Sequence, residues 1–177
     1  MKTVPNILAV SDAESQGKRL YNQMFLIPED DVDLTTLPVI SETDRTCAAL
    51  TLKTDAEWKQ FWFAKFTPAY TSEGSGNDIT TEVTNTISGT LAGDRAEIDD
   101  FIENQHGRGF YIVLIDRFTR KKMIYGRPYS PYYFQNHSKR KNSDNASCDV
   151  TFQAPSFFQP LEYLGSVESG ENNSSQE

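Results

Sequence analysis

Alternation of apolar and polar residues marks two segments of the chain, 81–91 and 148–154, as strands with one buried face. In the first segment, the positions between the apolar residues carry mostly hydroxyl side chains, so its second face is polar. We expect both to be antiparallel strands, because antiparallel sheets commonly have one face on the core and one in solvent. The apolar positions are Val83, Ile87 and Leu91 in the first segment and Cys148, Val150, Phe152 and Ala154 in the second.

The segment Phe110 to Ile115 has six apolar or aromatic residues in a row and no polar face. It is too short for a buried helix and rich in β-branched and aromatic residues, so we predict a strand. A basic turn follows it, and the segment 122–125 is expected to pair back as a hairpin. A strand that is apolar on both faces must be covered on both. A packed helix can cover one face, and the other needs a second sheet or a neighbouring subunit.

A complete short helix is predicted for residues 94–106. Asp94 can cap its N-terminus, with Glu97 three residues further on as in a capping box. Gly107 supplies a left-handed stop at the other end. One helix face carries apolar residues at the i, i+3 and i+4 positions, the pattern that buries a helix against a core. These residues are Ile98, Phe101 and Ile102.

Weaker patterns predict further strands and two loops. The segments 24–28 and 47–53 are each predicted to form a short strand. In the segment 57–66 the aromatic spacing fits a helix or a strand, and the density of aromatic residues favours the strand. We expect a loop at 71–78 and a polar loop with a basic core at 135–147, because of their Gly, Ser and Asn content.

Together these elements predict a mainly β fold of the α+β class: an antiparallel β-barrel or β-sandwich with one short packed helix. A length of 177 residues suits a single domain. We assign this domain to residues 1–165, with an extended N-terminal segment and loops. Residues 166–177 are acidic and low in hydrophobicity, so we expect a tail that is flexible alone or ordered by a partner.

The composition argues against several classes of protein. A net charge of -8 disfavours a broad basic surface that wraps DNA, but it is compatible with a wall that DNA slides past. No apolar run approaches the roughly 20 residues that span a bilayer. The N-terminus lacks the apolar region of a secretory signal. We therefore expect no association with a membrane.

No constellation of residues predicts catalysis. The two cysteines, Cys47 and Cys148, are expected to be small buried hydrophobes in a reducing compartment. The two histidines, His106 and His137, have no recognisable metal spacing with them and no neighbour that implies a catalytic triad. We expect no enzyme activity, no cofactor and no metal.

Two clusters of basic residues allow three interpretations. They form solvated loops, or they meet acidic loops of a neighbouring subunit by charge complementarity, or they bind phosphate, which the acidic total disfavours. The acidic run at 29–33 is the candidate counterpart in a contact between subunits. The candidate inter-subunit residues are Arg117, Arg120, Lys121, Lys122, Lys139, Arg140 and Lys141, with Glu29, Asp30 and Asp31 opposite them.

The order of these segments carries a family resemblance. The chain reads ISGTLAG at the end of an alternating strand, then AEIDDFIENQ, GFYIVLID with a basic turn, MIYG before RPYSP, and VTFQAPSFFQPLEYLG. This layout resembles the tail tube–like proteins of bacteriophages that infect Bacteroidota, crAss-like phages included. The resemblance covers roughly residues 50–165 and includes no catalytic signature. The loop at 136–147 is longer and more basic than the family pattern.

The resemblance implies a β-barrel subunit with a helix on its outside. It implies a homo-oligomer, a ring of six subunits whose inner strands form a channel for passing DNA, and neighbouring tail or neck proteins as partners. It places the protein in the virion tail, assembled in the host cytoplasm. The candidate residues for the lumen face are the hydroxyl residues of the alternating strand, Thr84, Thr86, Ser88 and Thr90.

Other functions remain open beside a repeating tube or hub subunit. The departure at 136–147 leaves room for a protein that occurs as a single ring, such as a head–tail connector of the neck. A function of another class is a soluble β-sandwich that binds carbohydrate. Its aromatic platform would be formed by Tyr129, Tyr132, Tyr133 and Phe134.

Overall fold

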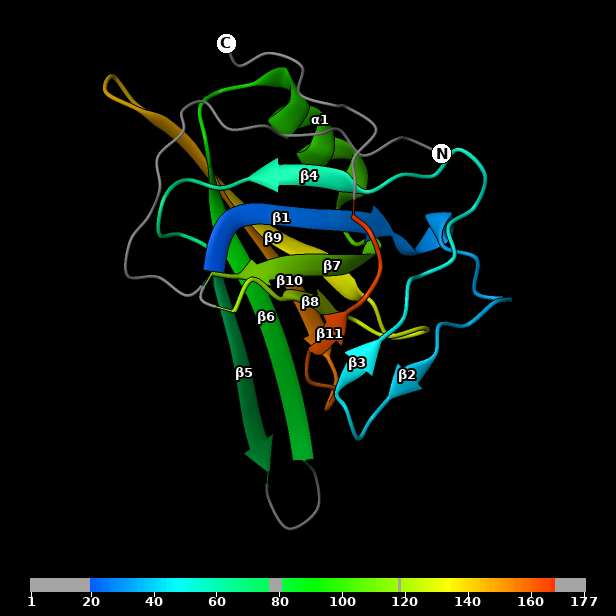
Figure 1. Ribbon diagram of the computed structural model, residues 1–177. Coiled ribbons are helices and arrows are strands. Elements are labelled where there is room, and N and C mark those ends of the chain that lie inside the picture. Colours follow the sequence, from blue (N-terminus) through cyan, green and yellow to red (C-terminus); the bar gives the residue numbers. More distant parts are fainter. Residues whose placement is uncertain (1–19, 77–80, 118, 168–177) are drawn as a thin grey trace.

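The protein is mainly β with one short α-helix, in a computed structural model that describes residues 20–76, 81–117 and 119–167 (Figure 1). The helix is α1 (Ala96–Gln105), and a 3-10 turn, η1, spans Glu29–Asp31. The strands are β1 (Leu20–Pro28), β2 (Ile40–Ser41), β3 (Thr46–Cys47), β4 (Lys59–Trp62), β5 (Ala69–Gly76), β6 (Thr81–Ala92), β7 (Gly109–Asp116), β8 (Lys122–Tyr125), β9 (Tyr132–Lys141), β10 (Ala146–Pro155) and β11 (Leu161–Tyr163).

Strand β7 is the point at which the sheet branches. One edge of β7 pairs with β1, which in turn pairs with β4. The other edge pairs with β8 over residues 112–115 and with β9 over residues 109–110. Two arms of the sheet therefore start at this edge, β8–β11–β3–β2 and β9–β10–β6–β5. The pairing of β11 with β3 is parallel, and the pairings along the second arm are all antiparallel.

The sheet bends strongly between its centre and the β9–β10–β6–β5 arm. Figure 1 shows β1, β4 and β7 running across the picture, while β5 and β6 run down it. The chain after β4 returns to the arm, because the N–H of Ala64 donates to the carbonyl of Thr90 in β6 at 2.7 Å. The N–H of Phe63 donates to the carbonyl of Asn22 in β1, also at 2.7 Å. These bonds bring β4, β1 and β6 around one apolar core.

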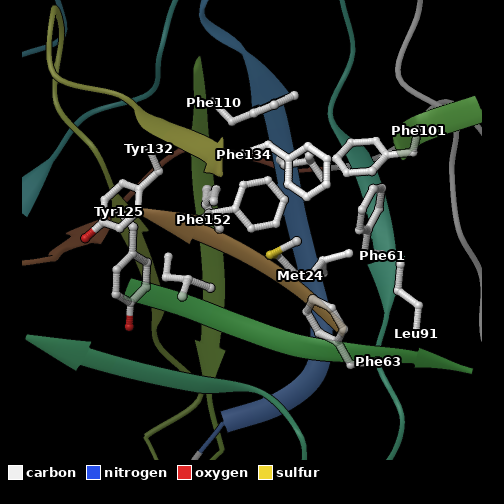
Figure 2. Packing of buried hydrophobic residues seen from close by; sticks show 14 of the residues in the cluster. Met24, Phe61, Phe63, Leu91, Phe101, Phe110, Tyr125, Tyr132, Phe134 and Phe152 are labelled. Atoms are coloured by element: carbon white, nitrogen blue, oxygen red, sulfur yellow. The ribbon is translucent and has the colours of Figure 1, made fainter. Parts of the chain in front are cut away.

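This larger core lies between α1 and the strands β1, β4, β6, β7, β9 and β10. Aromatic rings dominate it. The ring of Phe101 in α1 lies 4.8 Å from those of Phe61 and Phe134, measured between centroids. Phe152 of β10 lies 5.5 Å from Phe134, and Figure 2 shows these rings together around Met24. The helix is thus held on the sheet by an aromatic cluster at the centre of the core.

Both faces of β7 are covered within the same chain. Tyr111 and Val113 enter a second, smaller core, and the residues that alternate with them enter the larger one. The irregular segment 32–58 and β11 enclose the smaller core, where Trp58 packs edge-on against Tyr163 at 5.7 Å. The expectation that β7 is covered on both faces is confirmed. No neighbouring subunit is needed for it, because loops and short strands of the chain itself supply the second cover.

The alternating and the apolar strands predicted from the sequence are confirmed, and so is the hairpin of β7 with β8. The segment 57–66 forms a strand, β4, over four of its residues. The predicted inward positions of β6 and β10 are the buried ones, apart from Val83, which is half-buried. The strand segments confirmed in this way are 24–28, 57–66, 81–91, 110–115, 122–125 and 148–154.

The strand predicted at 47–53 is wrong beyond its first residue. Strand β3 ends at Cys47, and the backbone that follows bonds to scattered partners. The N–H of Leu50 donates to the hydroxyl of Tyr163 at 3.1 Å, and the carbonyl of Thr51 accepts from the N–H of Asp33 at 2.8 Å. Cys47 and Leu50 are buried because the segment forms a loop over the smaller core. The resulting sequence pattern resembles that of a strand.

Both predicted loops are wrong, because each contains a long strand. Strand β5 occupies 69–76 and pairs along its whole length with β6, although Gly, Ser and Thr dominate it. Residues 77 and 78 of that predicted loop lie outside the described ranges. Strand β9 runs to Lys141, so the predicted loop at 135–147 reduces to a tight turn closed by the N–H of Asn142 on the carbonyl of Asn145 at 3.0 Å.

The helix is confirmed, and its cap is not. Ile98 and Phe101 are fully buried, and Gly107 adopts a φ of 76° at the end of the helix, as predicted. The N-cap position is held by Arg95, and no side chain makes a capping hydrogen bond. The carboxylate of Asp94 instead binds two lysines of β9, so a long-range ion pair replaces the local cap.

The described part of the predicted tail is packed. Val167 is 9% exposed and belongs to the smaller core, next to β11. The remainder of that segment, 168–177, lies outside the described residues, as does the N-terminal segment 1–19.

Candidate assembly surface

The β9–β10–β6–β5 arm has one face on the larger core and a second face that points away from it. In β6, Ile87 and Leu91 are buried, and the residues that alternate with them are half-buried or exposed. The predicted hydroxyl face of this strand is therefore confirmed, with Thr84, Thr86, Ser88 and Thr90 on it. Their assignment to a lumen stays a prediction.

Side chains of all four strands contribute to this second face, which we call the polar face. The hydroxyl of Thr90 donates to Asp149 at 2.6 Å, and the amide of Gln153 donates to the hydroxyl of Thr86 at 3.4 Å. We define the polar face, from the strand register, by Thr71, Glu73 and Ser75 of β5, Glu82, Thr84, Thr86, Ser88 and Thr90 of β6, Asp149, Thr151 and Gln153 of β10, and Asn136, Ser138 and Arg140 of β9.

The polar face is negatively charged. Its carboxylates are those of Glu73, Glu82 and Asp149, and its one cation, Arg140, lies 3.8 Å from the carboxylate of Asp149. Hydroxyl and amide groups make up most of the rest, and the register also places Tyr133, Ala69, Ala92 and Pro155 on this side. Such a surface lacks the clustered basic residues that hold phosphate.

Strand β5 ends the arm, so one of its edges has no strand partner among the described residues. The backbone N–H and C=O of Thr90 point away from β10. The carbonyl accepts a hydrogen bond from the N–H of Ala64, and the N–H donates to the hydroxyl of Thr67 at 3.1 Å. Successive residues of a strand point their backbone groups to opposite edges. Ser88 therefore points its N–H and C=O toward β5, and its partner Ala69 points the same groups toward β6. The residues whose N–H and C=O point to the open edge are Tyr70, Ser72 and Gly74.

Strand β9 provides a second open edge, along residues 135–141. By the same alternation, the backbone N–H and C=O of Asp149 point toward β9. The same groups of its partner Ser138 therefore point toward β10. Among the described residues, no backbone bond outside the β9–β10 pair reaches the residues that alternate with Ser138. These outward-pointing residues are His137, Lys139 and Lys141.

Side chains on the outward-pointing residues of β9 hold the helix. The ammonium of Lys139 lies 2.7 Å from Asp94 and also binds Asp99, and Lys141 binds Asp94. Hydrogen bonds from both lysines lower the pKa of Asp94 to about 2, and hydrogen bonds to Asp94 and Asp99 raise the pKa of Lys139. Helix α1 is thereby fixed on the core side of the β9 edge.

The other basic candidates also have partners within the chain. Arg117 and Arg120 lie over the ring of Tyr21, at 5.8 Å and 4.9 Å from its centroid. Lys121 binds Glu162, and Lys122 donates to the carbonyl of Gly165.

The acidic candidates lie at another place, around η1. Asp30 lies 3.4 Å from Arg108, and Glu29 accepts a hydrogen bond from the hydroxyl of Tyr111 at 3.3 Å. The structure thus brings neither basic cluster together with residues 29–31 in one copy. Pairing of these groups between copies stays a prediction.

The two histidines meet, which spacing in the sequence did not indicate. His106 follows α1 and His137 lies in β9, and their ring centroids are 5.7 Å apart. Phe134 packs against both rings. Both cysteines are buried as expected, and burial raises the pKa of Cys47 and Cys148. Within the described ranges, no three His, Cys, Asp or Glu side chains gather as a metal site.

The aromatic platform proposed for a carbohydrate does not form. Tyr132 and Phe134 are buried in the larger core, at 2% and 0% exposure, while Tyr129 is exposed on a turn. The four residues predicted for it therefore do not share a surface, because β9 alternates its side chains between the core and the polar face.

A segment that the sequence did not single out, residues 156–159, lies against the core-side face of β5 and β6. The buried amide of Asn85 donates to the carbonyls of Ser156 and Phe158, at 2.7 Å and 3.2 Å. The amide of Gln159 donates to the hydroxyl of Ser72 at 3.1 Å. The segment thus ends beside the open edge of β5.

A comparison with protein-family models finds no match, and comparisons with curated proteins and with solved structures find none either. No described helix has the length and apolar character needed to cross a membrane.

Proposed function

We propose that this chain is a structural protein of a phage virion, a tail tube or tail hub subunit that assembles into rings around a channel for the genome. The observation that carries this proposal is the β9–β10–β6–β5 arm, which has a polar face and two edges without a strand partner among the residues that the structure describes. Copies join head to tail, with β5 of one copy pairing with β9 of the next.

The arm has an even number of strands, so β5 of one copy can pair antiparallel with β9 of the next. Neighbours along the arm are antiparallel, so β5 and β9 of one copy run in opposite directions. Strand addition between copies then continues the antiparallel order. At both edges, the residues whose backbone groups point outward, such as Ser72 and Lys139, have their side chains on the core side of the sheet. Polar faces therefore meet polar faces, and a head-to-tail contact that closes gives a ring.

The polar face becomes the wall of the channel in this assembly. Thr84, Thr86, Ser88 and Thr90 line it, with the carboxylates of Glu73, Glu82 and Asp149 beside them. Like charge keeps the duplex from adhering while it passes. The hydrogen bond from Ala64 to Thr90 supports a subunit that closes as a barrel, with α1 packed over its core and away from the polar face. The family resemblance favours six copies and a place in the virion tail, with tail or neck proteins as neighbours.

A single ring in the neck of the virion is the second candidate, because the same edges and the same polar face serve a head–tail connector. The β9–β10 hairpin gives this alternative its support. Arg140 lies level with the last pairing of β10 with β6, at Ser147 opposite Ala92, and the end of the hairpin with Lys141 reaches beyond it.

Light scattering after size-exclusion chromatography and negative-stain microscopy test the proposal. We expect rings or stacked rings of the wild-type chain at high protein concentration. Gly74→Pro should abolish them, because it removes an N–H that points to the open edge and none that bonds to β6. The control is Gly74→Ala, which keeps the N–H and places its Cβ no closer than 3.6 Å to Val83.

A wild-type chain that stays monomeric at every concentration, also together with its virion neighbours, would contradict the proposal. Rings that form equally well from the Gly74→Pro variant would contradict the β5–β9 contact.

A further inference from the structure

Segment 156–159 and helix α1 lie on the same side of the arm, at its two opposite edges. The segment is fixed to the core-side residues of β5: the hydroxyl of Tyr70 donates to Gln159 at 2.9 Å, and Gln159 donates to Ser72 at 3.1 Å. The helix is fixed to the core-side residues of β9, through Lys139 and Lys141. Within one copy the two elements are far apart, with α1 at the top of Figure 1 and the segment below β11.

The segment exposes an unusual apolar surface. Phe157 is 65% exposed and Phe158 is 50% exposed, although they are neighbours in the chain. The guanidinium of Arg127 lies 4.3 Å from the centre of the Phe158 ring, and it also binds Glu42. Adjacent exposed aromatic residues next to an open sheet edge are typical of a contact surface.

The outer surface of the helix is acidic. Its carboxylates Glu97, Asp100 and Glu103 are exposed, while Asp94 and Asp99 are bound by the lysines of β9. Arg127, in the turn after β8, packs on Phe158 from the side of the chain itself; its side chain is 13% exposed and is paired with Glu42.

We infer that α1 of one copy packs against Phe157 and Phe158 of the next, as a second contact beside the β5–β9 strand pairing. This inference rests on the proposed function. When β9 of one copy adds to β5 of another, the core-side faces become continuous, and α1 on the first is placed beside segment 156–159 on the second. In this arrangement the helix covers the aromatic pair.

Cross-linking tests the contact directly. A variant that carries both Asp100→Cys and Phe158→Cys is treated with a short bismaleimide. The native Cys47 and Cys148 are 3% and 0% exposed, so the bismaleimide should react with the new thiols alone. We expect a ladder of covalently linked copies, because each copy joins two neighbours. Each single-cysteine variant can join copies only in pairs. Adding Gly74→Pro to the double-cysteine variant should abolish the ladder.

A second variant tests the energetic weight of the contact. Phe157→Ser with Phe158→Ser should weaken self-association by about tenfold or more, as for residues at the centre of an interface. Both side chains are largely exposed in one copy, so the fold should be retained. The control is Leu164→Ser, an apolar residue with 62% exposure beside β11.

The outcomes separate this inference from the proposed function. Rings of the wild-type chain without a ladder, and with the two Phe variants assembling as well as Leu164→Ser, overturn the α1 contact and leave the ring proposal standing. A wild-type chain that does not assemble overturns both. A ladder that survives Gly74→Pro shows that α1 meets the aromatic pair without strand addition, which overturns the arrangement inferred here.

Discussion

Lys139 Nζ lies 2.7 Å from Asp94 Oδ1, and this contact joins the open edge of β9 to the chain just before α1. The second lysine of the strand, Lys141, binds the same carboxylate. A residue with the sequence context of a helix cap thereby serves as the anchor of a strand edge. The position of α1 relative to the edge depends on these charges as well as on the aromatic core under the helix.

Acid should weaken this anchor in a defined range of pH. The folded protein holds the pKa of Asp94 at about 2, below the ordinary value of 3.8. A lowered folded pKa contributes stability that is fully present above the unfolded pKa and is lost as pH falls toward the folded one. We expect Asp94→Asn to lower the free energy of unfolding at pH 6, with a difference from wild type that shrinks between pH 4 and pH 2.

Denaturant unfolding of both chains at a series of pH values measures this difference. Glu97→Gln is the control, because Glu97 is an exposed carboxylate of the same helix. A gap between Asp94→Asn and wild type that stays constant down to pH 2 would show that the carboxylate acts through something other than its charge.

Gly89 should not tolerate a side chain. It lies in β6 on the core side, and an added Cβ would come within 2.6 Å of the Phe63 ring. The ring is 4% exposed and has no room to move away, so Gly89→Ala should destabilise the protein by about 1–3 kcal/mol, as overpacking does. Gly74→Ala, with its nearest atom at 3.6 Å, is the matched control. Equal unfolding midpoints of the two variants in guanidinium chloride would refute this packing.

Asn85 should hold segment 156–159 in place. Its amide is fully buried and donates to the carbonyls of Ser156 and Phe158, and its oxygen shares the one hydroxyl proton of Tyr70 with Gln159, at 3.2 Å and 2.9 Å. Asn85→Ala removes the bonds from a buried position to this segment, while Tyr70 keeps its bond to Gln159, so we expect a cost of about 1–3 kcal/mol.

Hydrogen exchange read by mass spectrometry should also show faster exchange of residues 156–160 in Asn85→Ala, because the segment loses its anchor. The control is Thr84→Ala, at the neighbouring exposed position of β6. A segment that keeps its protection in Asn85→Ala would mean that Gln159 and the packing of the loop suffice to hold it.

The sequence predicted the parts of the fold whose burial follows a local period. Strands β6 and β10 alternate with period two because one face of each lies on the core, and α1 shows its stripe for the same reason. Strands β5 and β9 have no such signal over most of their length. Residues 71–76 and 135–141 lie mostly beyond the core, so Gly, Ser and basic residues are allowed there. Their strand conformation comes from β6 and β10, which are distant partners.

The candidate surface was predictable only in part for the same reason. The hydroxyl face of β6 could be derived from one segment, whereas the two open edges depend on the order of strands in the sheet. The apolar strand β7 shows the limit clearly. Its two apolar faces correctly predicted that packing would bury both. The local sequence did not indicate that a loop with Trp58 and a short strand with Tyr163 would bury the second face.

A positive charge on the polar face should turn a surface that repels DNA into one that holds it. Wild-type rings should not retain duplex DNA near physiological salt, because the face combines hydroxyl groups with the carboxylates of Glu73, Glu82 and Asp149. A variant with Thr84→Lys, Thr86→Lys and Ser88→Lys places three ammonium groups on one strand of the proposed channel wall. Its binding, measured by fluorescence anisotropy of a labelled duplex, should appear and should fall steeply as salt is raised.

The control adds the same charge elsewhere. Thr36, Thr43 and Thr54 are exposed and lie in the irregular segment between η1 and β4, away from the arm. Lysine at these three positions gives the same net charge without a channel lined by it, so the affinity should be clearly weaker and independent of ring assembly. Adding Gly74→Pro should remove most of the binding of the first variant, because a ring multiplies the ammonium groups around one duplex. Equal binding by the two lysine variants would show that the polar face does not surround the DNA.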